Sequence, residues 1–118
     1  MKRTLSPLEL AYLGDAVHTL FVREWALENF DKPMNDLNKI CSDKCSAVHQ
    51  SAVLSSLTLT EEEADVARRA RNVKSKHTAK NADVKDYKFA TAFEAVVGYL
   101  KITGQEERLK EILKLSVK

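Results

Sequence analysis

The chain has 118 residues, 44% of them hydrophobic, so it can bury one apolar core, and we expect a single domain over residues 1–118. The first residues lack the apolar run of a signal peptide, and no stretch reaches membrane-spanning length, so a cytoplasmic protein is expected. The net charge is only +2, yet six of the 19 Lys and Arg residues lie within 66–82, which contains no Asp or Glu. Such segregated positive charge suits a polyanionic partner.

The amino-terminal residues predict a long first helix. Ser6 can cap it, Pro7 suits its first turn, and Glu9 can complete a capping box with Ser6. The apolar pattern continues to about Asn29, and Pro33 marks the break that follows.

The rest of the chain also predicts helices and almost no strand, so the expected fold class is all-α. Thr60 and Glu63 form a second capping box, and Gly104 can end a helix. We expect further helices at 35–57, either whole or divided around Ser42 and Asp43, from 60 into the basic run, from about 83 to 103, and from 105 to 115.

Two predicted helices each carry a carboxylate and a glycine within an apolar run. Gly14 and Asp15 lie within the run 10–17, and Glu94 and Gly98 have the same relation to apolar neighbours further on. Glycine permits close helix approach, and two carboxylates brought together repel each other unless a cation lies between them, which suggests a magnesium site. The alternative is that both carboxylates lie on solvated stripes, paired to Lys or Arg.

Cysteine and histidine residues offer a weaker constellation. Cys41, Cys45 and His49 have helical spacing, but the first and last are about 12 Å apart along a helix at 1.5 Å per residue, too far for one zinc ion. A pair of them with ligands from elsewhere stays open, and buried thiols are the simpler interpretation. His18 is expected to be a hydrogen-bonded helix residue without a catalytic role.

Both acidic motifs resemble those of a known family. LAYLGDAV is similar to the ERLEFLGDAVL pattern of the ribonuclease III catalytic domain, and TAFEAVVGYL is similar to that family's DTVEALIGA helix. With RRARNVKSKHTAKNADVKDYKFATAFEAVVGY, the resemblance extends over residues 5–113 and is closest to the mini-ribonuclease III branch, which lacks a separate double-stranded RNA-binding domain. It implies a ribonuclease III-like helical bundle that forms a two-fold homodimer.

The resemblance also implies an activity and a site. Asp15 and Glu94 match the pair that the family uses to bind Mg²⁺, and its members cut double-stranded RNA to leave 5′-phosphate and 3′-hydroxyl ends. Three positions depart from the broad family: Leu8 and Ala11 replace glutamates, and Thr91 replaces an aspartate. The mini branch shares these losses, which put strong occupancy of a second metal in doubt.

The branch is associated with maturation of 23S ribosomal RNA precursor ends, and the resemblance implies that role and that substrate. The basic run then has a role, because its side chains can contact duplex phosphates. We expect it to be a mobile loop that becomes ordered when RNA binds. The alternative for this run is a solvated loop. The candidate RNA-binding residues are Arg68, Arg69, Arg71, Asn72, Lys74, Ser75, Lys76 and Lys80.

The assembly and two other function classes complete the expectations. Tyr12, Phe21 and Trp25 give the first helix an apolar surface that a homodimer would bury. A non-catalytic double-stranded RNA-binding or ribosome-assembly module is the alternative on the same fold. A protein-interaction dimer without RNA is disfavoured by the segregated charge.

Overall fold

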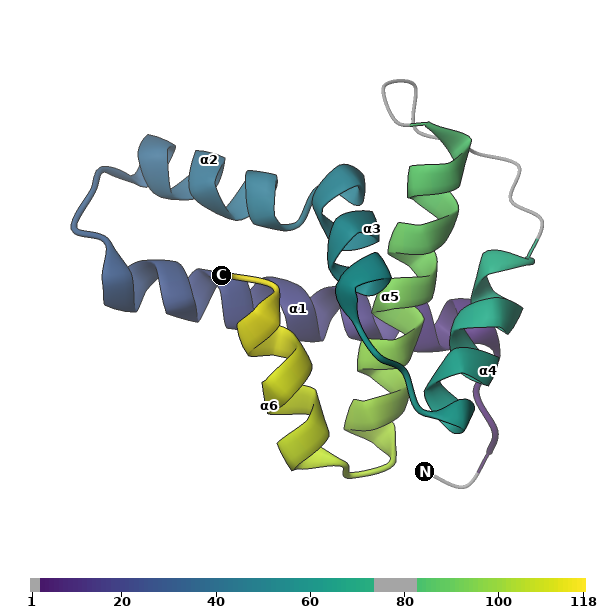
Figure 1. Ribbon diagram of the computed structural model, residues 1–118. Helices are drawn as coiled ribbons and strands as arrows, with labels where there is room; N and C mark the ends of the chain where they lie inside the picture. The colour runs from purple at the N-terminus through teal and green to yellow at the C-terminus, as the bar shows by residue number, and fades with distance from the viewer. Residues whose placement is uncertain (1–2, 74–82) are drawn as a thin grey trace.

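A computed structural model describes residues 3–73 and 83–118, and these residues form six α-helices and no strand (Figure 1). The all-α prediction is confirmed. No helix in this part of the chain is both long and apolar enough to cross a membrane. The predictions for Lys74, Ser75, Lys76 and Lys80 lie outside the described residues. The helices are α1 (Pro7–Asn29), α2 (Met34–Lys44), α3 (Ala47–Ser56), α4 (Glu61–Arg71), α5 (Val84–Ile102) and α6 (Glu106–Leu115).

Both predicted capping boxes start helices. The Ser6 hydroxyl accepts from the Glu9 backbone N–H at 3.2 Å, and the Glu9 carboxylate accepts from the Ser6 N–H at 2.9 Å. Thr60 and Glu63 repeat this exchange at 3.2 and 3.1 Å. Each box satisfies two backbone donors that would otherwise lack a partner, which fixes the first residues of α1 and α4.

The segment 35–57 is divided into two helices, but not where the sequence placed the division. Helix α2 continues past Ser42 and Asp43 to Lys44, and α3 begins after Ser46. The Ser46 hydroxyl accepts from the His49 N–H at 3.2 Å, so this serine caps α3. The break therefore falls at the residue whose side chain can satisfy the new helix terminus.

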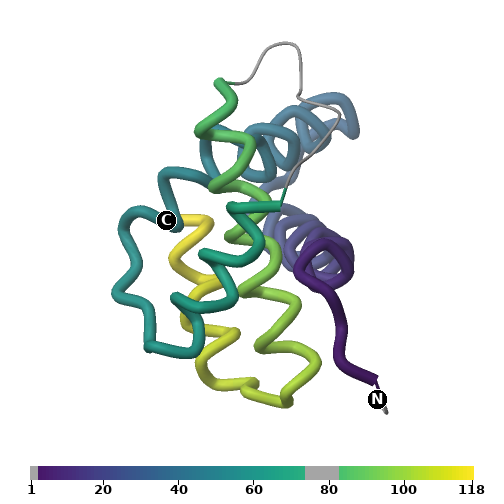
Figure 2. The backbone as a smooth tube through the Cα atoms, turned by 90° about the vertical axis from the view of Figure 1, so that its right-hand side faces the viewer, coloured from purple at the N-terminus to yellow at the C-terminus, as the bar shows by residue number. Residues whose placement is uncertain are grey.

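Helix α5 lies at the centre of the fold. It crosses α1 steeply, and α3, α4 and α6 pack around its remaining sides (Figures 1 and 2). Its apolar residues extend around most of its circumference, as expected of a helix enclosed by others. Its largest fully buried side chains are Phe93, Val96, Val97 and Leu100.

A buried ion pair joins α4 to α6. The Glu63 carboxylate accepts from Arg108 Nε at 3.0 Å and from its Nη2 at 2.9 Å, and the same Nη2 donates to the Thr58 carbonyl at 2.9 Å. Glu63 is only 1% exposed, and its hydrogen bond to Arg108 lowers the pKa of its carboxyl. Removing one partner of such a pair typically costs about 3–5 kcal/mol. This contact stabilises the bundle on the side formed by α4 and α6.

The apolar surface of α1 differs in part from the expectation. Tyr12 is exposed, whereas Phe21 packs against the core and Trp25 packs edge-on against Phe30 at a centroid distance of 5.4 Å. The inward turn of Phe21 follows from the helical period, because it lies half a turn away from Tyr12 around the axis. Two of the three aromatic residues assigned to the dimer surface therefore stabilise the protomer itself.

Candidate active site

Two glycines allow α1 and α5 to cross in backbone contact. A Cβ atom on Gly14 would lie 1.7 Å from the Glu94 carbonyl oxygen, and one on Gly98 would lie 1.9 Å from the Leu10 carbonyl oxygen. Neither position tolerates a side chain, because ordinary contact begins at 3.4 Å. The glycines that weaken each helix locally thus set the crossing point. They also place Asp15, which follows Gly14, beside Glu94.

Asp15 affects the ionisation of the Glu94 carboxyl group. Burial raises the pKa of Glu94, and the negative charge of Asp15 and a hydrogen bond with it raise this pKa further, to about 8. Glu94 is half-buried, whereas Asp15 is exposed and accepts from the Thr19 hydroxyl at 3.5 Å. Asp15 therefore does not lie in an apolar core, as its neighbours in the sequence suggested. Those neighbours lie on different faces of α1. Leu10, Gly14 and His18, spaced four residues apart, form the face that turns inward.

This acidic pair suits a divalent cation. Within residues 3–73 and 83–118, neither carboxylate forms an ion pair with Lys or Arg, so the interpretation as solvated, paired stripes is not supported there. Mg²⁺ often binds through one or two carboxylates and completes its octahedron with water and substrate phosphate oxygens. No group of three or more His, Cys, Asp or Glu side chains that could hold a metal occurs in the described part. Among the described residues, Asp15 and Glu94 are the pair that could hold such a cation.

The positions that depart from the broad family pattern do not add ligands. Ala11 is buried and carries no donor atom. The Thr91 hydroxyl donates to the Tyr87 carbonyl of its own helix at 3.0 Å, so it is already engaged. Both observations are consistent with one acidic pair and no second set of carboxylates beside it.

A hollow of about 610 Å³ opens at the surface beside Asp15. It is lined by the start of α1 and the residues before it: Arg3, Leu5, Glu9, Tyr12, Leu13, Asp15 and Ala16. A larger hollow of about 720 Å³ lies along α4 and contains neither Asp15 nor Glu94. The exposed position of Asp15 next to open space allows a large ligand to reach it.

His18 is a hydrogen-bonded helix residue, as predicted. It is fully buried, its Nε2 lies 3.1 Å from Ser116 Oγ, and its Nδ1 lies 3.0 Å from Gln50 Nε2. Burial, and to a smaller extent the nearby His49, lowers the pKa of His18 to about 4. No sequence pattern indicated Gln50, since a glutamine on a helix has no periodic signal that distinguishes it.

The Cys–His constellation has other partners. Cys41 and Cys45 are half-buried free thiols, and burial raises the pKa of Cys45. His49 Nε2 lies 2.6 Å from the Ser116 carbonyl oxygen and so helps to fix the end of the chain. These contacts agree with the simpler interpretation of the two cysteines as packed thiols.

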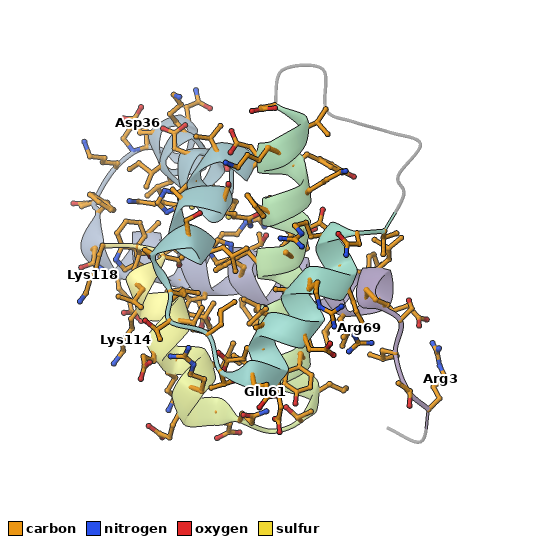
Figure 3. All side chains as sticks on the ribbon, turned by 45° about the vertical axis from the view of Figure 1, so that its right-hand side comes forward. Arg3, Asp36, Glu61, Arg69, Lys114 and Lys118 are labelled. Carbon is orange, nitrogen blue, oxygen red and sulfur yellow. The ribbon has the colours of Figure 1, made fainter. Side chains whose placement is uncertain are left out.

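The described members of the basic run lie at the end of α4. Arg68, Arg69, Arg71 and Asn72 are all exposed. Arg68 and Arg69 both bind the Asp65 carboxylate, the latter through Nε at 3.1 Å. Figure 3 shows Arg69 on the same side of the molecule as Arg3, and the two line one shallow hollow. Arg3 is a basic residue that the sequence did not single out.

Comparisons with known proteins agree with this arrangement. The family model described as ribonuclease III domain matches residues 8–105, which include Asp15 and Glu94. The chain is 49% identical to a protein named Mini-ribonuclease 3 from Symbiobacterium thermophilum, over 93% of this chain and 86% of that one. It is 44% identical to a Mini-ribonuclease 3 from a Thermoanaerobacter species, over 97% and 82%. A crystal structure of a Fusobacterium nucleatum protein superimposes with a TM-score of 0.89 at 35% identity, over 98% of this chain and 93% of that one.

Proposed function

We propose that this chain, which belongs to the ribonuclease III domain family and is an endoribonuclease of that type, cuts double-stranded RNA with Mg²⁺ bound at Asp15 and Glu94. The observation that carries the proposal is the backbone contact of α1 and α5 at Gly14 and Gly98, which brings Asp15 near enough to raise the pKa of Glu94. Two adjacent acidic groups without a basic partner repel each other, and a cation between them removes that cost.

Asp15 and Glu94 have different roles in the proposed site. Mg²⁺, when bound, supplies a Lewis acid for the scissile phosphate and favours ionisation of an attacking water. Glu94, whose pKa is raised to about 8 by burial and by Asp15, would hold the cation in its ionised form and would lose its proton to solvent to do so. Asp15 holds the exposed side of the site, next to the hollow through which a phosphate can approach. Hydrolysis at this site would leave 5′-phosphate and 3′-hydroxyl ends.

The duplex is proposed to contact the basic surface at the end of α4. Arg68, Arg69 and Arg71 are exposed there, and Lys and Arg can neutralise backbone phosphates without reading sequence. The proposed substrate is 23S ribosomal RNA precursor, which the resemblance to the mini-ribonuclease III branch implies; relatives named Mini-ribonuclease 3 support membership of that branch.

A two-fold homodimer is proposed from the exposed face of α1. Tyr12, Leu20 and Leu27 are 84%, 60% and 66% exposed and lie on one side of the helix by its 3.6-residue period. A soluble protomer would gain by covering such a row of large apolar side chains against a second copy. Light scattering at micromolar concentration should give the dimer mass, and Leu20→Glu should shift it towards the protomer; a wild-type monomer would contradict the proposal.

Cleavage of a labelled RNA duplex tests the function. The wild type should cut the duplex with Mg²⁺ and not with EDTA, and Asp15→Asn should lower the cleavage rate by at least 100-fold while duplex binding is retained. Glu111→Gln, on the exposed surface of α6, serves as the matched control and should cut normally. Near-normal cleavage by Asp15→Asn would refute the site. A wild type that binds the duplex and never cuts would instead favour a non-catalytic RNA-binding module.

A further inference from the structure

Three buried polar side chains form a chain of hydrogen bonds behind the acidic pair. His18 comes from α1, Gln50 from α3, and Ser116 from the residue after α6, and they are 0%, 3% and 0% exposed. Burying polar groups costs free energy that is recovered only when they bond to one another. A helical bundle can be closed with apolar residues alone, so the presence of this chain calls for a role.

The direction of each hydrogen bond follows from the far end of the chain. The Ser116 hydroxyl donates to the Leu113 carbonyl at 2.6 Å, so its oxygen accepts from His18 Nε2–H at 3.1 Å. Because His18 is buried and neutral, its single ring proton is then on Nε2, and Nδ1 must accept. Because His18 Nδ1 accepts, the Gln50 amide must turn its NH₂ group towards it, and Gln50 Nε2 lies 3.0 Å from Nδ1.

The other hydrogen of this amide is available to Glu94. Hydrogen bonding from the Gln50 amide lowers the pKa of the Glu94 carboxyl group, against the larger effects of burial and of Asp15 that raise it. These hydrogen-bonded side chains also pack against α5, because the His18 ring lies edge-on against Phe93, the residue before Glu94, at a centroid distance of 5.0 Å. The chain of hydrogen bonds therefore ends on the buried side of the acidic pair, opposite the exposed Asp15.

We propose that Gln50 is a positioning residue for Glu94: His18 and Ser116 hold its amide as a donor, and this donor fixes the carboxylate for a divalent cation. The inference rests on the proposed function of the Asp15–Glu94 site. Groups that orient a metal ligand in this way typically change metal affinity or activity by about 10- to 100-fold when they are removed. A purely structural network would change stability and leave the metal affinity unaltered.

The test compares three variants of the full chain with the wild type. Gln50→Leu fills the same space without a donor, and Ser116→Ala breaks the chain at its remote end. Glu63→Gln is the matched control, because it weakens a buried ion pair between α4 and α6 and involves neither Asp15 nor Glu94. Mn²⁺ binding to the RNA-free protein is measured by electron paramagnetic resonance, together with thermal unfolding and the kcat and KM for duplex cleavage.

We expect Gln50→Leu to weaken Mn²⁺ binding by about 10- to 100-fold and to lower kcat with KM unchanged within twofold. Ser116→Ala should show a smaller loss of the same kind, and it decides the question by itself if Gln50→Leu does not fold. Glu63→Gln should lower the melting temperature with normal Mn²⁺ affinity. Normal Mn²⁺ affinity in both Gln50→Leu and Ser116→Ala would overturn the role of Gln50 and leave the proposed function untouched. A wild type that neither binds Mn²⁺ nor cuts would overturn the proposed function and this role with it.

Discussion

Replacing Gly14 by alanine should damage the fold and the site together. The new Cβ would lie 1.7 Å from the Glu94 carbonyl oxygen and 2.9 Å from the Gly98 nitrogen, both of which are backbone atoms of α5. Ordinary contact begins at 3.4 Å, so α5 must withdraw from α1 by about 1.7 Å. Alanine favours the helix by about 1 kcal/mol over glycine, but overpacking typically costs about 1–3 kcal/mol, and more where rigid backbone is displaced.

Because the displaced atoms are backbone, the upper end of this cost or more applies, and we expect a net destabilisation of about 2 kcal/mol or more, which for a chain of this length lowers the melting temperature by about 8 °C or more. The separation of Asp15 from Glu94 should also weaken Mn²⁺ binding in whatever protein remains folded. Gly104→Ala is the control. It has open space around it and a φ of +70°, so alanine should cost only about 1–2 kcal/mol through backbone strain and leave Mn²⁺ binding normal. Thermal unfolding and Mn²⁺ titration of Gly14→Ala measure both effects. A variant with wild-type stability and affinity would refute the close crossing of α1 and α5.

Three further predictions follow from charges at the site and on α4. In metal-free protein the pKa of Glu94 is raised from 4.5 to about 8, so between these pH values the folded state keeps a proton that the unfolded state releases. The contribution of Glu94 to stability should therefore fall as pH rises through this range. The fall is at most about 1.4 kcal/mol per pH unit before solvent screening. Below about pH 6.5 the lowered pKa of His18, about 4, makes an opposite contribution, so the window that isolates Glu94 is about pH 6.5 to 8. Urea unfolding over that window should show this slope in the wild type and lose it in Glu94→Gln. Asp15→Asn should be as stable as the wild type or more so without metal at pH 8, because it relieves repulsion; a clear loss would indicate an undetected basic partner. Replacing Arg68, Arg69 and Arg71 with alanine should weaken duplex binding and reduce the salt slope by about 2–3, whereas alanine at Lys101, Lys110 and Lys114 should not, and equal slopes would show that the α4 charges are merely solvated.

The helices were predictable where short-range signals determine them. Ser6 and Thr60 each stand three residues before a glutamate, and the interaction that defines a capping box involves no other part of the chain. The division before α3 was less certain, because Ser42, Asp43 and Ser46 are all suitable caps within five residues. Only the packing of α2 against α1 decides which of them begins the new helix.

The approach of the two acidic residues was predictable from the sequence, and their surroundings were not. A glycine beside Asp15 and another about one turn after Glu94 indicate two helices in backbone contact, and the structure shows that contact at Gly14 and Gly98. The exposure of Asp15 depends on which face of α1 turns away from α5, and an apolar run on both faces conceals it. The link from His18 to Ser116 joins residues 98 positions apart, so no local pattern could reveal it.

The most direct test of the central claim is to locate a divalent cation. Crystals of the protein soaked in Mn²⁺ and measured at the manganese absorption edge should show an anomalous peak between the Asp15 and Glu94 carboxylates. The same peak should be absent from crystals of Asp15→Asn. A wild-type crystal of cleavage-competent protein with no peak at this crossing, or with its peak elsewhere, would contradict the assignment of these two residues as the metal site.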